Sequence, residues 1–289
     1  KTVNIISRPQ AQPFWAQTTR ATTLQTLHIE ESGPRGRTVV YIPGLAGTTR
    51  YWRGHLDALQ QNYHTVLVDP LGFGDSPRPW TRYTIENHVE ALRQVLNKYA
   101  PFTLVGHSMG ALLSVAYAAR HPEQVEGLVL VSLPYYGGKE QAVRIVRKSS
   151  PFYRMFFGNV VLAAIICMLT RRVFGRLAPY LQPDLPREVA ADVVKHSWRS
   201  FTSSLWEVIY NYDAKRDADL LGDRIPILCI HGDRDPIAPL AGAQALANGR
   251  PNWRVQVLPG VDHHPLFRAP EATWPAIESA LSPRLAASR

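Results

Sequence analysis

The sequence has little that would support a metal-binding or disulfide-stapled protein. Only two of its 289 residues are cysteine, Cys167 and Cys229, and both stand in apolar runs. A thiol in such a run usually serves as a small buried hydrophobe. No cysteine or histidine spacing typical of a zinc site accompanies them. We therefore expect no metal, no cofactor and no disulfide framework.

The chain also lacks the signals that would link its charge to nucleic acid. It carries 32 Lys and Arg against 23 Asp and Glu, a net charge of +9. Such an excess can attract nucleic acid, an anionic membrane or an anionic substrate. However, no RNP-like aromatic cluster and no long block of basic residues goes with it. We favour a solvated basic surface and expect no nucleic-acid partner.

No uncharged stretch reaches the length of about 20 apolar residues that crosses a bilayer. The longest runs from Met155 to Thr170, with Arg154 and Arg171 on its flanks. We favour a pocket-lining helix, and the alternative is a helix lying in a membrane interface. The chain opens at Lys1 without a signal-like segment. We expect a soluble protein, with the cytoplasm slightly favoured and peripheral membrane contact through this stretch as the alternative.

Short apolar runs alternate with helix-like segments along most of the chain. This pattern is typical of a mostly parallel sheet with helices on both faces. We expect strands at Thr38–Ile42, Thr65–Val68, Phe102–Val105, Gly127–Val131, Ile227–Ile230 and Arg254–Leu258. We expect helices at Ile85–Tyr99, Met109–Arg120, Leu240–Asn248 and Pro270–Leu281. A segment near Leu24–Glu31 alternates polar and apolar residues and predicts antiparallel edge strands.

The pattern changes after Pro134. Strand-like runs disappear, aromatic and basic residues become frequent, and helical periodicity dominates. Because strands and helices alternate again from Ile225, the segment interrupts one sheet and does not form a second tandem domain. We predict a helical lid, or cap, at residues 134–223, inserted into a core formed by residues 1–133 and 224–289.

A serine between two glycines joins one predicted strand to the helix that follows it. The run Gly106-His-Ser108-Met-Gly110 has the form G-x-S-x-G. A side chain at the tip of so tight a turn crowds the residues two before and two after it, and glycine relieves the clash. The turn lifts the serine hydroxyl above the carboxyl end of the strand, where ligands of open sheets bind. Ser108 is therefore the candidate nucleophile.

A serine hydroxyl needs a neighbouring base to remove its proton. Imidazole suits this work because its pKa of about 6.5 leaves it neutral near pH 7. His263 and His264 follow the last predicted strand, where a loop can reach back over the sheet. Adjacent side chains point in different directions, so only one of the two faces Ser108. We favour His263 as the base, with His264 as the alternative.

The imidazolium formed during catalysis needs a buried carboxylate on its other nitrogen. Asp233 and Asp235 follow the penultimate predicted strand, and either could instead cap the next helix. We favour Asp235, because its place three residues past Gly232 matches the usual arrangement of such a triad.

Backbone amides beside the serine would hold the oxyanion of a tetrahedral intermediate. The Met109 amide directly follows the nucleophile. The Leu45 amide lies in the loop after the Thr38–Ile42 strand, where Gly44 allows a close backbone approach. We expect these two amides to form the oxyanion hole.

Taken in order, these motifs resemble the α/β-hydrolase superfamily, in particular its lidded serine esterases and lipases. The chain order Ser, Asp, His belongs to this fold. Residues 69–76, with the sequence DPLGFGDS, resemble the family's D-x-x-G-x-G-x-S loop. The early loop departs from the family, since Pro43-Gly44 stands where His-Gly is usual. The resemblance implies an α/β fold with a mostly parallel eight-stranded sheet and an inserted helical lid.

For function, the resemblance implies a serine hydrolase that cleaves a small-molecule carboxylic ester with a lipophilic group through an acyl-enzyme intermediate. Thioester hydrolysis, carbon–carbon bond hydrolysis and acyl transfer are alternatives on the same triad. A weakly catalytic ligand-binding protein, or a membrane-surface protein, is the alternative of another class. The aromatic residues of the predicted lid are candidate substrate contacts, namely Phe156, Phe157, Trp198 and Trp206.

Overall fold

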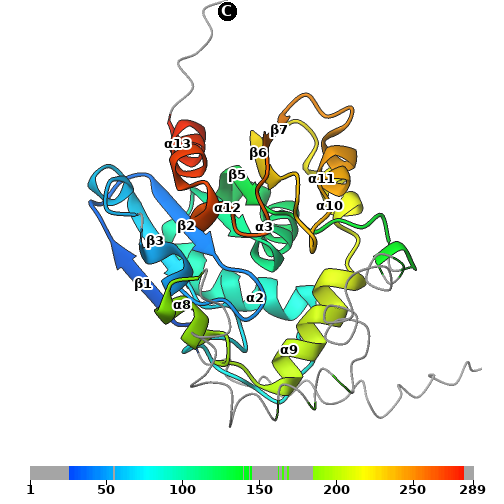
Figure 1. The fold of residues 1–289 in the computed structure, drawn as a ribbon. Coiled ribbons are helices and arrows are strands. Elements are labelled where there is room, and N and C mark those ends of the chain that lie inside the picture. The colour runs from blue at the N-terminus through cyan, green and yellow to red at the C-terminus, as the bar shows by residue number, and fades with distance from the viewer. Residues whose placement is uncertain are drawn as a thin grey trace, which may run out of the picture.

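One sheet of seven strands forms the centre of the computed structural model, with helices on both faces (Figure 1). The structure describes residues 26–54, 56–138, 140–142, 144, 162, 165, 168 and 185–282. The strands are β1 (Ile29–Ser32), β2 (Thr38–Ile42), β3 (His64–Val68), β4 (Phe102–His107), β5 (Val125–Val131), β6 (Ile227–Gly232) and β7 (Trp253–Leu258). Their order across the sheet is β1-β3-β2-β4-β5-β6-β7, and only the β1–β3 pair is antiparallel.

The described helices connect and cover these strands. They are α1 (Arg50–Arg53), α2 (Ile85–Leu96), α3 (Met109–Arg120), α8 (Arg187–Asp192), α9 (Trp198–Ser204), α10 (Ala214–Leu221), α11 (Leu240–Ala247), α12 (Pro265–Arg268) and α13 (Pro270–Leu281). Short 3-10 segments are η2 (Leu59–Gln61), η3 (Asn97–Tyr99) and η4 (Pro122–Gln124), and η5 (Leu205–Tyr210) is a π-helix. Among the described residues, no helix is both long enough and apolar enough to cross a membrane.

The expected α/β fold with a mostly parallel sheet is confirmed, but the expected eighth strand is wrong for the described chain. The segment near Leu24–Glu31 contributes one antiparallel strand, β1, of four residues. Gly33 follows directly, with φ of +87°, and turns the chain toward β2. The predicted helix Ile85–Tyr99 also ends early, because its last turn tightens into η3.

Alternating side chains of the strands fill two separate apolar layers. In β2, Val40 and Ile42 join the layer that holds α2 and α3. Val39 and Tyr41 join the opposite layer, with side chains of α1 and α13. Burial of each such side chain stabilises the fold by about 1.5–3 kcal/mol. Because helices cover both faces of the sheet, a ligand is expected at the ends of the strands.

The order of the strands places a crevice at one point of that edge. The chain passes from β2 outward to β3 and then crosses to the other side of β2 to form β4. Ligands of open α/β sheets bind outside the carboxyl ends of the strands, at the point where the order reverses. Here that point lies between β2 and β4, so it is flanked by the loop beginning at Pro43 and by Ser108.

The described part of residues 134–223 contains α8, α9, η5 and α10. These helices lie along the chain between β5 and β6, which are parallel neighbours in the sheet. The intervening residues therefore leave the sheet and return to the adjacent position. In Figure 1, α8 and α9 lie at the opposite end of the molecule from α13. That residues 134–223 act as a lid over the site stays a prediction.

Candidate active site

Ser108 occupies a strained turn between β4 and α3. Its φ of +52° and ψ of −117° lie outside the regions that side chains ordinarily adopt. A Cβ on Gly106 would stand 2.4 Å from the Gly110 carbonyl oxygen, and one on Gly110 would stand 2.1 Å from the Ile42 carbonyl oxygen. Both distances are far below contact, so glycine is required at these two positions. The turn has the geometry that the G-x-S-x-G pattern predicts.

Three residues from three loops form one chain of hydrogen bonds. Ser108 Oγ lies 3.0 Å from His263 Nε2, and His263 Nδ1 lies 2.7 Å from Asp235 Oδ2. Only 6% of Ser108 and 6% of His263 are exposed, and the Asp235 side chain is fully buried. Because a carboxylate only accepts, His263 Nδ1 carries the proton and Nε2 is free to accept from the serine hydroxyl.

The loop after β6 holds Asp235 in its ionised form. Its Oδ1 accepts hydrogen bonds of 2.8 Å from the amides of Ile237 and Ala238. Burial alone would raise the pKa of Asp235, but the His263 imidazole and the two amides outweigh it and hold this pKa below its usual range. The carboxylate is therefore an anion at neutral pH, with its second oxygen aimed at His263.

The structure separates the favoured candidates from their sequence alternatives. His264 does not face Ser108; its Nδ1 lies 3.3 Å from the Tyr51 hydroxyl, and burial lowers its pKa to about 4. Asp233 accepts a 2.6 Å hydrogen bond from the Gly260 amide and so braces the loop after β7. His263 and Asp235 are thus the pair brought to Ser108.

The predicted oxyanion-hole residues both lie beside the serine. Met109 is the first residue of α3, where backbone N–H groups have no partner within the helix. Leu45 lies in a turn closed by a 3.0 Å hydrogen bond from the Gly47 amide to the Gly44 carbonyl. A Cβ on Gly44 would stand 3.1 Å from Ser108 Cβ, so this turn packs directly against the nucleophile. Their role as donors stays a prediction.

The candidate substrate contacts of the predicted lid are only partly described. Phe156 and Phe157 lie outside the described residues. Trp198 is 39% exposed and meets Trp80 edge to face, with the Arg199 guanidinium 3.4 Å from the centre of the Trp80 ring. Trp206 is half-buried and packs on Tyr210. That Trp198 and Trp206 contact the substrate stays a prediction.

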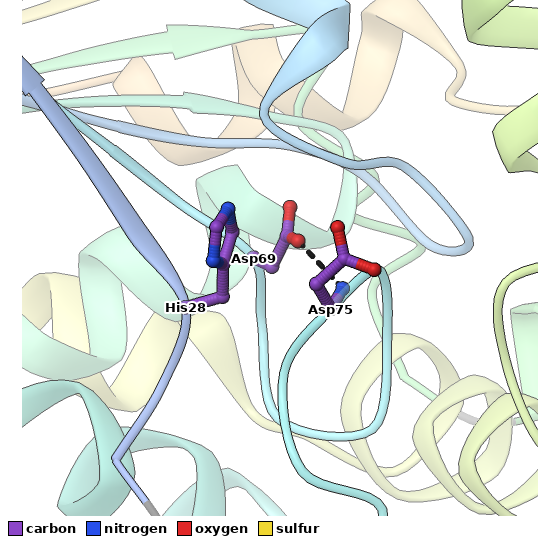
Figure 2. Close-up of side chains that lie close together, drawn as sticks. All are labelled: His28, Asp69 and Asp75. Atoms are coloured by element: carbon purple, nitrogen blue, oxygen red, sulfur yellow. Dashed lines mark hydrogen bonds between the residues drawn. The ribbon is translucent and has the colours of Figure 1, made fainter.

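A second group of three residues, none of them in the triad, has metal-ligand chemistry. Figure 2 shows His28, Asp69 and Asp75, whose ligand atoms all lie within 4.8 Å of one another. Both Asp69 oxygens are already in use, since they accept from the amides of Thr49 at 2.7 Å and Asp75 at 2.8 Å. His28 Nε2 lies 3.3 Å from a Glu30 carboxylate oxygen. The cluster therefore fits a clamp for the loop of residues 69–76 better than a metal site.

Two histidines that the sequence did not mark as candidates lie beside the triad. The ring centre of His107 lies 5.0 Å from that of His263. His231 is buried, with Nε2 3.7 Å from Asp235 Oδ2. The signal that could have found both is their position at the carboxyl ends of β4 and β6.

Comparison with known proteins gives one family. A family model described as the alpha/beta hydrolase fold matches residues 37–270. Among curated relatives, Probable lysophospholipase BODYGUARD 1 of Arabidopsis thaliana is 28% identical to this chain. The alignment covers 78% of this chain and 54% of the relative. The uncharacterized protein Rv2715 of Mycobacterium tuberculosis is 22% identical over 85% of this chain and 74% of its own length.

Solved structures show the same fold. A thermophilic esterase from Thermogutta terrifontis superposes with a TM-score of 0.68 at 20% identity, covering 88% of this chain and 92% of that one. A bromoperoxidase from Bacillus anthracis gives a TM-score of 0.71 at 23% identity, covering 88% and 95%. The chain spans about half the length of the plant relatives that it matches.

Proposed function

Because the chain belongs to the alpha/beta hydrolase fold family, we propose that it is a serine hydrolase that cleaves a carboxylic ester through an acyl-enzyme intermediate. The observation that carries the proposal is the continuous hydrogen-bonded chain Ser108, His263, Asp235. A serine bonded to a base that is itself oriented by a buried acid has the arrangement of an activated nucleophile.

In the proposed mechanism, His263 Nε2 takes the proton of Ser108 as Oγ attacks the ester carbonyl carbon. The amides of Leu45 and Met109 hold the oxyanion that forms, and the positive end of α3 adds to its stabilisation. His263 then gives its proton to the departing alcohol, which leaves the acyl group on Ser108. Water, deprotonated by His263, attacks this acyl group and releases the acid, and Ser108 recovers its proton.

The proposed substrate is an ester with a lipophilic group. Two observations support it: the relatives from Arabidopsis thaliana carry the name probable lysophospholipase, and the predicted lid is rich in aromatic residues. Thioesters, activated carbon–carbon bonds and acyl acceptors other than water are the competing substrates on the same triad.

The nucleophile is tested by labelling with a fluorophosphonate probe. We expect the parent protein to be labelled and to hydrolyse p-nitrophenyl esters, and we expect Ser108→Ala to lose both properties. Ser114→Ala is the matched control, because Ser114 is a buried serine of α3 whose hydroxyl donates to the Gly110 carbonyl. That variant should keep its label. Labelling or turnover that survives in Ser108→Ala overturns the assignment.

The bond and the acyl group are tested with a substrate series. We expect p-nitrophenyl esters with medium or long acyl chains to give higher kcat/KM than the acetate, because a longer apolar chain buries more surface. A preference confined to acetate contradicts the lipophilic pocket. Faster turnover of matched thioesters than of oxygen esters would favour the thioesterase alternative.

A further inference from the structure

Two buried imidazoles outside the triad contact the loops that carry it. His107 ends β4 and is 3% exposed, and His231 lies in β6 and is fully buried. His107 Nε2 lies 2.9 Å from the backbone oxygen of His263. His231 Nε2 lies 2.7 Å from the backbone oxygen of Ala238. Each imidazole thus makes one hydrogen bond to one of the two loops that complete the triad.

The chemistry of these bonds fixes the state of both rings. A carbonyl oxygen only accepts, so each Nε2 carries a proton and donates it. Burial lowers the pKa of His107 well below its usual range and also lowers that of His231, which keeps both rings neutral at physiological pH. In the described residues, the Nδ1 atom of each ring is buried with no hydrogen-bond partner. Leaving a buried polar atom unpaired costs about 1–3 kcal/mol.

His107 acts on the backbone of the base itself. Its bond ends on the carbonyl of His263, the residue whose side chain meets Ser108. The Tyr51 ring stacks on the His107 ring, with centres 4.5 Å apart and planes 23° apart. His107 directly precedes Ser108 in the sequence. Its ring therefore connects the backbone at Ser108 to the backbone at His263.

His231 acts on the turn that presents the acid. Its bond ends on the Ala238 carbonyl, and the amide of the same Ala238 donates to Asp235 Oδ1. Ala238 is therefore held on one side by His231 and holds the carboxylate on the other. This contact keeps Asp235 Oδ2 turned toward His263 Nδ1, 2.7 Å away.

We propose that His107 and His231 are positioning residues, which hold the His263 loop and the Asp235 turn in register with Ser108 through single bonds to backbone carbonyls. The inference rests on the proposed function, because it concerns the same triad. A displacement of about 1 Å in such a site lowers the rate on the order of 100-fold. Loss of either bond therefore acts on catalysis and not only on folding.

The test compares side chains that reach the carbonyl with side chains that do not. Gln places its amide nitrogen about as far from the backbone as imidazole Nε2, whereas Asn is one methylene shorter and Leu has no donor. Each replacement is made separately at His107 and at His231. His88→Leu is the matched control, because His88 is also fully buried but bonds the Ser204 hydroxyl and neither triad loop.

At both positions, we expect Leu and Asn to lower kcat for a p-nitrophenyl ester about 10- to 100-fold, with KM changed less than about threefold. The Gln variants should have a kcat at least tenfold higher than that of the Leu and Asn variants. The acid limb of the kcat/KM profile should move to lower pH in the Leu and Asn variants, because a misaligned Asp235 stabilises the His263 imidazolium less. His88→Leu should lower Tm without moving kcat or that limb.

The outcomes separate this inference from the function on which it rests. If the parent is neither labelled by the fluorophosphonate at Ser108 nor active on any ester, the proposed function fails. If the parent is active and the folded Leu variants keep its kcat and pH profile, the positioning role is wrong. Should a Leu variant fail to fold, the ratio of Gln to Asn activity decides, and equal activities overturn the inference.

Discussion

The two carboxylate oxygens of Asp235 have different hydrogen-bond partners. Oδ1 is occupied by the two amides of its own turn, and Oδ2 alone meets His263. An asparagine at position 235 would keep one oxygen that accepts from the amides of the turn. Its NH₂ group, however, would face His263 Nδ1, which is itself a donor in the parent protein. His263 would have to adopt the other tautomer, with its proton facing the serine.

We therefore expect Asp235→Asn to fold normally and to lose about 10⁴-fold in kcat, because the wrong tautomer cannot take the serine proton. Steady-state turnover of a p-nitrophenyl ester measures the loss, and circular dichroism checks the fold. Asp233→Asn is the control, because its oxygen can still accept from the Gly260 amide. Similar losses in both variants would contradict the assignment of the acid.

The glycines of the serine turn have no room for a Cβ atom. We expect Gly106→Ala to lower the free energy of unfolding by at least about 2 kcal/mol, because its Cβ would lie 2.4 Å from the Gly110 carbonyl oxygen and force the turn apart. Gly127→Ala in neighbouring β5 is the control, since its Cβ would meet nothing closer than 3.5 Å. Urea unfolding measures both, and equal stabilities would show that the turn yields freely.

At the scale of elements, the buried Asp69 joins three segments that are separate in the chain. Its carboxylate accepts from Thr49, beside α1, and from Asp75, in its own loop. Its backbone oxygen accepts from the Ser76 hydroxyl, which in turn accepts from the His28 amide before β1. This network fixes the loop after β3 against the loop after β2, on which the Leu45 amide is carried.

We expect Asp69→Ala to lower Tm by several degrees, because the buried amide of Thr49 and the partly buried amide of Asp75 lose their acceptor. Asp75→Ala should change Tm little, since that side chain is exposed and its ion pair with Lys195 spans 3.7 Å. EDTA should leave the Tm and kcat of the parent unchanged, as expected of a clamp. A chelator-dependent loss of stability would identify the cluster of Figure 2 as a metal site.

The elements that could be predicted are those whose pattern is local. The bounds of Thr38–Ile42, Met109–Arg120 and Pro270–Leu281 agree with β2, α3 and α13, because periodicity and flanking turns define them. The triad candidates could be chosen for the same reason, since each follows a recognisable strand. The number of strands could not be predicted, because edge strands depend on pairing partners that the segment does not contain.

The contacts of His107, His231 and Tyr51 could not be predicted from the sequence, for a physical reason. The hydrogen bond from His107 joins it to a residue 156 positions away in the chain. The stacking of Tyr51 on His107 produces no periodic pattern in the sequence. A strand end predicts that a side chain lies near the site. It does not indicate which backbone carbonyl that side chain will meet.

At the scale of the whole molecule, buried neutral histidines link stability to pH. Burial lowers the pKa of His88 to about 3 and that of His264 to about 4, and lowers those of His107 and His231 as well. The unfolded chain binds protons on these residues below a pKa of about 6.5, whereas the folded chain does not. Their contribution is therefore present above pH 6.5 and is lost as the pH falls toward 4.

We expect the free energy of unfolding to drop between pH 6.5 and pH 4 by up to about 1.4 kcal/mol per pH unit for each such histidine. Urea unfolding at pH 7, 6 and 5 measures the slope. His88→Gln should reduce the slope by about 1 kcal/mol per pH unit between pH 6 and pH 5. An unchanged slope in this variant would contradict a buried neutral His88.

The strand order has a consequence for the newly synthesised protein. Ser108 follows β4, whereas Asp235 and His263 follow β6 and β7, which come last in the chain and lie side by side at one edge of the sheet. A ribosome synthesises the chain from its amino terminus, so Ser108 is translated well before Asp235 and His263. If these three residues form the proposed triad, the growing chain cannot carry out the proposed reaction during most of its synthesis. It could begin to react only after the residues that follow β7 have been made.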